Sequence, residues 1–85
     1  MRILVADDEP MVQLLLSQTL EEAGHTVDIA TNGADALERL RTHTYDLLLT
    51  DVHMPRLNGI DLVRAVRQQN KRIPIIVMDS YPDLF

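Results

Sequence analysis

Residues 1–10 read MRILVADDEP, and residues 2–6 of this stretch form a short aliphatic run that ends in acidic residues. Continuous aliphatic runs of this length are typical of strands that are buried on both faces of a parallel sheet. The run is too short for the apolar core of a signal peptide. We therefore expect a buried parallel strand over residues 2–6, followed directly by carboxylates.

Helical and strand patterns alternate downstream of this first strand. Apolar residues recur at helical spacing between Val12 and Ala23, and Gly24 occupies the position of a helix-ending glycine. Asn32 and Asn58 can each cap a further helix. The apolar faces of these two helices contain Ala36, Leu37 and Leu40 in one and Leu62, Val63 and Val66 in the other. The remaining strands are expected over residues 27–30, 45–50 and 74–78.

This alternation of four strands and three helices predicts an α/β fold. Strands that alternate with helices of this length pair in parallel through right-handed crossovers. We predict an open parallel sheet with strand order 2-1-3-4, the (βα)3β portion of a flavodoxin-like fold. The length of 85 residues and the hydrophobic content of 46% fit one small globular domain.

Acidic residues follow three of the four expected strands. Asp7 and Asp8 follow the first strand, Asp51 ends the third, and Asp79 follows the fourth. Ligands of open α/β sheets bind beyond the carboxyl ends of the strands, and the predicted order makes the first and third strands neighbours. We therefore expect Asp7, Asp8 and Asp51 to lie together. Their mutual repulsion favours a bound cation such as Mg²⁺, beside which a carboxylate could form an aspartyl phosphate.

Composition narrows the classes of function. The formal net charge of −5 argues against non-specific nucleic-acid binding and suits cations and basic partner surfaces. The sequence contains no cysteine, which removes disulfides and thiolate metal sites and fits a cytoplasmic location. No apolar run approaches the roughly 20 residues that span a bilayer, so we expect no association with a membrane.

Three short motifs form a specific combination along the chain. They are DDEP at residues 7–10, Asp51 at the end of the third strand, and MPRLNG at residues 54–59. Together they closely resemble the response-regulator receiver family of two-component signalling, over nearly the whole chain. The resemblance implies that Asp51 accepts a phosphoryl group from a sensor histidine kinase or a phosphotransfer protein.

The resemblance also implies a set of metal ligands and a loop. Mg²⁺ would be held by Asp7, Asp8, Asp51 and the backbone carbonyl of His53. An imidazole ligand from His53 is the alternative interpretation. The residues that would shape the loop after the acceptor are Pro55 and Gly59.

The chain departs from the family pattern in two ways. Receivers usually carry Ser or Thr five residues after Pro74, where this chain has Asp79 followed by Ser80. Asp79 and Ser80 are therefore the candidates for the switch residue, with a further metal ligand as the alternative role of Asp79. The last helix, strand and helix of the family, including an active-site lysine, have no counterpart here. Residues 1–85 are thus expected to form an incomplete receiver domain.

The missing fifth strand would leave the edge of the fourth strand open to pairing with another chain. We therefore expect one of three outcomes: self-association through that edge, recruitment of a partner that covers the exposed surface, or a fold of marginal stability. A second hypothesis follows, namely a receiver-like interaction or oligomerisation module, or a fragment, that no longer signals by phosphorylation. A phosphatase of the haloacid-dehalogenase type also uses an aspartyl phosphate, but the chain is too short for one, and we expect no enzyme.

Overall fold

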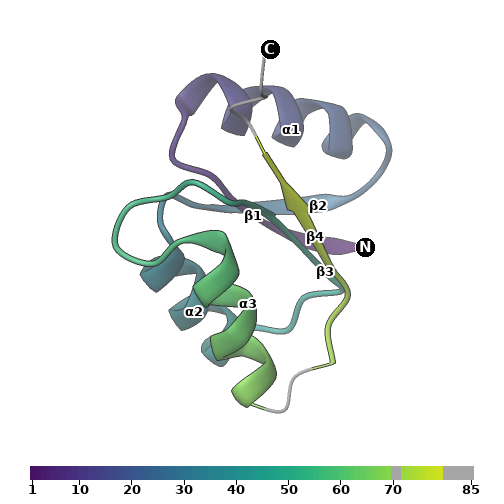
Figure 1. Ribbon diagram of the computed structural model, residues 1–85. Helices are drawn as coiled ribbons and strands as arrows, with labels where there is room; N and C mark the ends of the chain where they lie inside the picture. The colour runs from purple at the N-terminus through teal and green to yellow at the C-terminus, as the bar shows by residue number, and fades with distance from the viewer. Residues whose placement is uncertain (70–71, 80–85) are drawn as a thin grey trace.

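In the computed structural model, four parallel strands form one sheet between two layers of helices (Figure 1). The structure describes residues 1–69 and 72–79. The strands are β1 (Arg2–Ala6), β2 (Thr26–Ala30), β3 (Leu47–Asp51) and β4 (Ile75–Met78), and the helices are α1 (Pro10–Glu22), α2 (Gly33–Thr42) and α3 (Gly59–Gln68). The order β2-β1-β3-β4 confirms the predicted α/β class and the predicted strand order.

Strand β1 lies between two neighbours and is buried on both faces. Leu4 is paired in register with Leu48 of β3, and both side chains pack in the core beneath α2 and α3. Ile3 and Val5 point to the other face and form a second core cluster with side chains of α1. Each of these fully buried aliphatic side chains stabilises the fold by about 1.5–3 kcal/mol. The aliphatic run of β1 is thus explained by its burial on both sides.

Two asparagines begin helices in the way the sequence predicts. The side chain of Asn32 accepts a hydrogen bond from the backbone N–H of Asp35 at 2.8 Å. The side chain of Asn58 accepts one from the backbone N–H of Asp61 at 2.9 Å. Each bond satisfies an N–H group that the first turn of a helix leaves without a backbone partner. Both caps lie on the side of the sheet where the strands end, so they fix the direction of α2 and α3.

The two helical layers differ in how much of the sheet they cover. Helices α2 and α3 lie on one face, whereas α1 is the helix that the described residues place on the other (Figure 1). A helix with its side chains is about 10 Å across, and four strands about 4.8 Å apart span about 15 Å. One helix is therefore too narrow for this face. As a result Ile76 of β4 is 51% exposed, and on the helix itself Leu15 is 64% exposed.

The start of β3 differs from the expected strand over residues 45–50. Tyr45 precedes the strand and is buried, and its hydroxyl donates a hydrogen bond to Asp28 Oδ2 of β2 at 2.6 Å. The guanidinium of Arg2 stacks over the Tyr45 ring at 5.1 Å and also donates to Asp28. The hydrogen bond from Tyr45 is the main cause that lowers the pKa of Asp28. Side-chain contacts to β1 and β2 thus replace strand pairing at Tyr45.

Self-association through the edge of the fourth strand and the incompleteness of the domain both stay predictions. Within the described residues, β4 pairs with β3 and forms the margin of the sheet. The described part of the chain neither tests self-association through this margin nor tests whether residues 1–85 are an incomplete domain. None of the helices in the described ranges combines the length and the apolar character that a membrane crossing requires.

We predict that Tyr45→Phe lowers the free energy of unfolding by about 1.5 kcal/mol at pH 7, because a hydrogen bond to a charged group is lost. The bond favours the ionised form of Asp28, so its contribution is present above the unfolded pKa of that carboxyl and is lost as the pH falls through the folded pKa. Urea unfolding at pH 7 and about pH 3 measures both effects. Equal stability of the two proteins at pH 7 would contradict this prediction.

Candidate functional site

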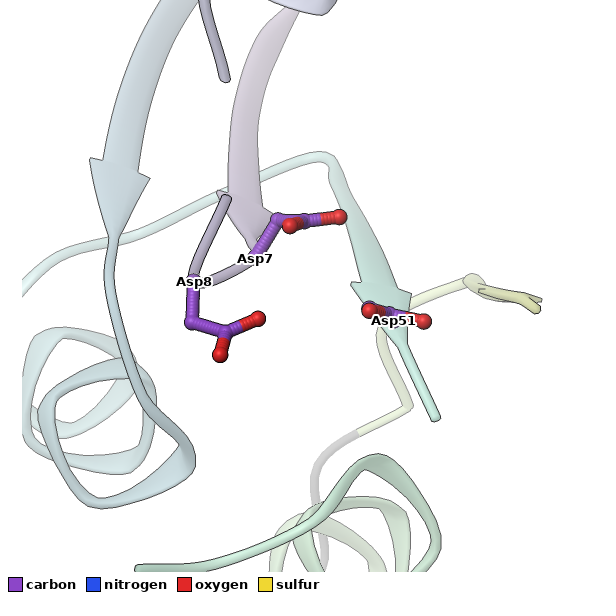
Figure 2. Close-up of side chains that lie close together, drawn as sticks. All are labelled: Asp7, Asp8 and Asp51. Carbon is purple, nitrogen blue, oxygen red and sulfur yellow. The ribbon is translucent and has the colours of Figure 1, made fainter. Parts of the chain in front are cut away.

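The site lies at the edge of the sheet where β1 and β3 end. Asp7 directly follows β1, and Asp51 is the last residue of β3. Figure 2 shows these two residues side by side, with Asp8 next to Asp7. One carboxylate oxygen of each of the three residues lies within 4.8 Å of the other two. The structure therefore brings together Asp7, Asp8 and Asp51 as the sequence predicts.

Asp7 is held in place by three neighbouring segments. Its backbone N–H donates to the carbonyl oxygen of Ala30, the last residue of β2, at 3.0 Å. Its Oδ1 atom accepts a hydrogen bond from the backbone N–H of Glu9 at 2.9 Å. Its own carbonyl oxygen accepts one from Gln13 Nε2 of α1 at 2.6 Å. These bonds leave the Asp7 carboxylate little freedom to turn away from Asp51.

The electrostatics of Asp7 are unfavourable when the site holds no cation. Its side chain is 0% exposed, and its Oδ2 atom has no hydrogen-bond partner among the described residues. Burial raises the pKa of Asp7, and the charges of Asp51 and Asp8 raise it further, against the lowering effect of the Glu9 N–H. A buried carboxylate oxygen without a partner costs free energy that a cation would recover.

The donor set at this edge fits Mg²⁺. Among the described residues, the side chains grouped here offer carboxylate oxygens, which hard divalent cations prefer over nitrogen or sulfur ligands. Two of the three carboxylates, Asp7 and Asp51, are fully buried, and the third, Asp8, is exposed. The unpartnered Oδ2 atom of Asp7 is the observation that points most directly to a missing positive charge.

The loop after Asp51 is fastened to β4 and to α3. The backbone N–H of Val52 donates to the carbonyl oxygen of Met78 at 2.8 Å, and the carbonyl oxygen of Val52 accepts from the Gly59 N–H at 3.0 Å. A Cβ atom on Gly59 would overlap the carbonyl oxygen of Asp51. The absence of a side chain at Gly59 thus lets α3 begin against the end of β3, beside the acidic site.

The middle of this loop is a tight turn that packs on α2. Arg56 has a φ of 70°, a left-handed conformation that costs a non-glycine residue about 1 kcal/mol. The Leu57 N–H donates to the carbonyl oxygen of Pro55 at 2.8 Å. A Cβ atom on Gly33 would overlap the carbonyl oxygen of Leu57. Sequence reasoning missed Gly33, although a glycine directly after the cap Asn32 was a signal for close backbone approach.

Two further predicted site residues, His53 and Asp79, contact each other. His53 Nε2 lies 3.3 Å from Asp79 Oδ1, and both side chains are about half exposed. In the described residues, Asp79 is not part of the group of carboxylates close enough to share one ion. The geometry therefore pairs the His53 imidazole with Asp79, and it does not support Asp79 as a further metal ligand. Ser80, the other switch candidate, lies outside the described residues.

Comparison with known proteins gives a consistent result. Residues 3–84 match the family described as the response regulator receiver domain. The chain is 48% identical over 73 residues to the sensor protein EvgS of Escherichia coli, a match that covers 86% of this chain and 6% of EvgS. EvgS and the other curated relatives are much longer proteins. The chain spans between 6% and 35% of their length.

Two solved structures of the response regulator TrrA from Thermotoga maritima are also similar. One is TrrA in complex with Mg²⁺ and BeF, with 39% identity and a TM-score of 0.89, covering 94% of this chain and 70% of that one. The other is the histidine kinase ThkA in complex with TrrA, with 37% identity and a TM-score of 0.88, covering 98% of this chain and 72% of that one.

We predict that Asp7→Asn stabilises the metal-free chain by about 1–3 kcal/mol at pH 7, because it removes a buried negative charge and keeps an acceptor for the Glu9 N–H. The amide can also donate to the neighbouring carboxylates. Urea unfolding with a chelator present measures the change. A destabilisation in the absence of metal would contradict this account of the site.

The pH dependence of stability gives a second test of Asp7. Because its folded pKa is raised above the ordinary 3.8, at a pH between the two pKa values the folded chain holds a proton that the unfolded chain has lost. Stability from this group is present below the unfolded pKa and is lost as the pH rises through the folded pKa. We therefore expect the metal-free wild type to lose stability relative to Asp7→Asn as the pH rises from about 4. A constant difference between the two proteins across this range would count against it.

Proposed function

Since the chain belongs to the response regulator receiver domain family, we propose that Asp51 accepts a phosphoryl group while Mg²⁺ is held by Asp7, Asp8, Asp51 and the backbone carbonyl of His53. The chain would then act as a receiver in a two-component phosphorelay, as a signalling module and not as an enzyme. The observation that carries this proposal is the convergence of three carboxylates at the ends of two strands, with one buried oxygen that has no hydrogen-bond partner in the described part of the chain.

In the proposed reaction, the protein supplies one nucleophile, the Asp51 carboxylate. An oxygen of the Asp51 carboxylate would attack the phosphorus of a phosphohistidine. The new P–O bond forms as the P–N bond breaks, and the imidazole nitrogen leaves with the electron pair of that bond and takes up a proton from water. A bound Mg²⁺ would neutralise negative charge on the transferring group.

The protein's own part is to hold Asp51 in place. Asp51 ends a strand that is paired on both sides, with β1 and with β4. Its side chain is 0% exposed, and the Thr50 hydroxyl donates to its carbonyl oxygen at 3.0 Å. A carboxylate on such a rigid element keeps its orientation while charge moves to it, which favours an in-line attack on phosphorus.

The proposed partner is a sensor histidine kinase or a phosphotransfer protein. It is supported by the similarity to EvgS, a sensor protein, and to TrrA, which has been solved in complex with the kinase ThkA. The acidic balance of the chain, −5 at pH 7, suits a partner with a basic surface around its phosphohistidine. A cytoplasmic location belongs to the same proposal, since the chain contains no cysteine.

We predict that acetyl phosphate with Mg²⁺ adds one phosphoryl group to the chain, because a carboxylate beside a divalent cation can attack a small phosphodonor without a kinase. Intact mass spectrometry detects the addition, and peptide mapping locates it on Asp51. Asp51→Asn should abolish the addition, and so should a chelator.

A matched control is Asp46→Asn at the opposite end of β3, where the carboxylate accepts a hydrogen bond from the Arg2 N–H, an acceptor role that the amide oxygen keeps. This variant should be phosphorylated as the wild type is. If the folded wild type takes up no phosphoryl group, or takes it up at another residue, the proposal is wrong.

A further inference from the structure

The pair formed by His53 and Asp79 has no part in the function proposed so far. Their side chains meet at 3.3 Å between Nε2 and Oδ1. His53 stands two residues after the end of β3, and Asp79 directly follows β4. The contact therefore ties the start of the loop after Asp51 to the end of the neighbouring strand, beside the three carboxylates.

The His53–Asp79 contact continues the pairing between β3 and β4 by one residue on each segment. The last backbone contact between the two segments joins the Val52 N–H to the Met78 carbonyl oxygen at 2.8 Å. His53 and Asp79 are the next residues along the two segments, so their side chains continue the connection. Beyond them the loop turns through Arg56, whose φ of 70° is a conformation that few non-glycine residues adopt. The pair therefore fastens the loop on one side of a strained turn.

We propose that the His53–Asp79 pair positions the backbone carbonyl of His53 for the bound cation, which makes both side chains positioning residues for Mg²⁺. This inference rests on the proposed cation site. The His53 carbonyl would be the ligand that the loop after β3 supplies, whereas Asp51 ends β3 and Asp7 directly follows β1. Its direction depends on how the loop leaves β3, and the pair restrains the loop at that residue.

A simpler role for Asp79 makes the opposite prediction for His53. If Asp79 only attracted the cation through its charge, removing the imidazole beside it would leave Mg²⁺ affinity unchanged or raise it, because the carboxylate would remain and would lose a competing partner. If the pair positions the loop, removing the imidazole lowers the affinity. An exposed pair of this kind is worth about 0.4–1 kcal/mol, so the expected loss is about two- to fivefold.

The test is a titration of the chain with Mg²⁺ alone, followed by NMR at one fixed pH. His53→Leu removes the donor and keeps a side chain of similar length, and it should weaken Mg²⁺ binding about two- to fivefold. His53→Gln keeps an N–H donor near the position of Nε2 and should restore most of the affinity. His43→Leu, at an exposed histidine near the opposite end of the sheet, is the matched control and should bind as the wild type does.

The outcomes separate this inference from the proposed function. Weaker binding by His53→Leu, recovery in His53→Gln and unchanged melting temperatures support the positioning role. If the wild type binds Mg²⁺ and His53→Leu binds it equally well or more tightly, the inference is wrong and the cation site stands. If the folded wild type binds no Mg²⁺, the inference and the proposed cation site are wrong together.

Discussion

The mutual repulsion of three carboxylates at one edge of the sheet is the constraint on which the rest of the structure depends. Asp7 and Asp51 are carried there by strands β1 and β3, which are neighbours and are buried on both faces. Core packing therefore prevents the two carboxylates from separating, although burial, and in addition the charge of Asp51, raises the pKa of Asp7. A bound cation would relieve this cost, and the oxygen-only donor set is suited to Mg²⁺.

The surroundings of the site combine rigid strands with a loop that is held by a few specific contacts. Gly59 lets α3 begin against the carbonyl of Asp51, and Gly33 lets the same loop pack on the start of α2. The pair of His53 and Asp79 connects the loop to β4. A change in charge at Asp51 would thus act on a loop that three different elements restrain. This arrangement suits a module that reports its chemical state to a partner.

Much of this architecture could be predicted from local patterns. The aliphatic run of β1, the caps Asn32 and Asn58, and the carboxylates after two strands each depend on neighbours in sequence, together with one rule about strand order. The rest depends on tertiary contacts. No local signal shows that Ile76 is exposed because one helix is too narrow for its face of the sheet. In the same way, only the folded chain shows that Asp79 contacts His53. It also shows that Tyr45 lies outside β3 and donates a hydrogen bond to Asp28.

The central claim is that this acidic edge binds a cation and then a phosphoryl group. The most direct test is an NMR titration with beryllium fluoride, a mimic of the phosphoryl group, with and without Mg²⁺. The account predicts saturable shifts around Asp51 and Asp7 only when both reagents are present, and their loss in Asp51→Asn. A folded wild-type chain that shows no Mg²⁺-dependent shift, or the same shift in Asp51→Asn, would contradict the account.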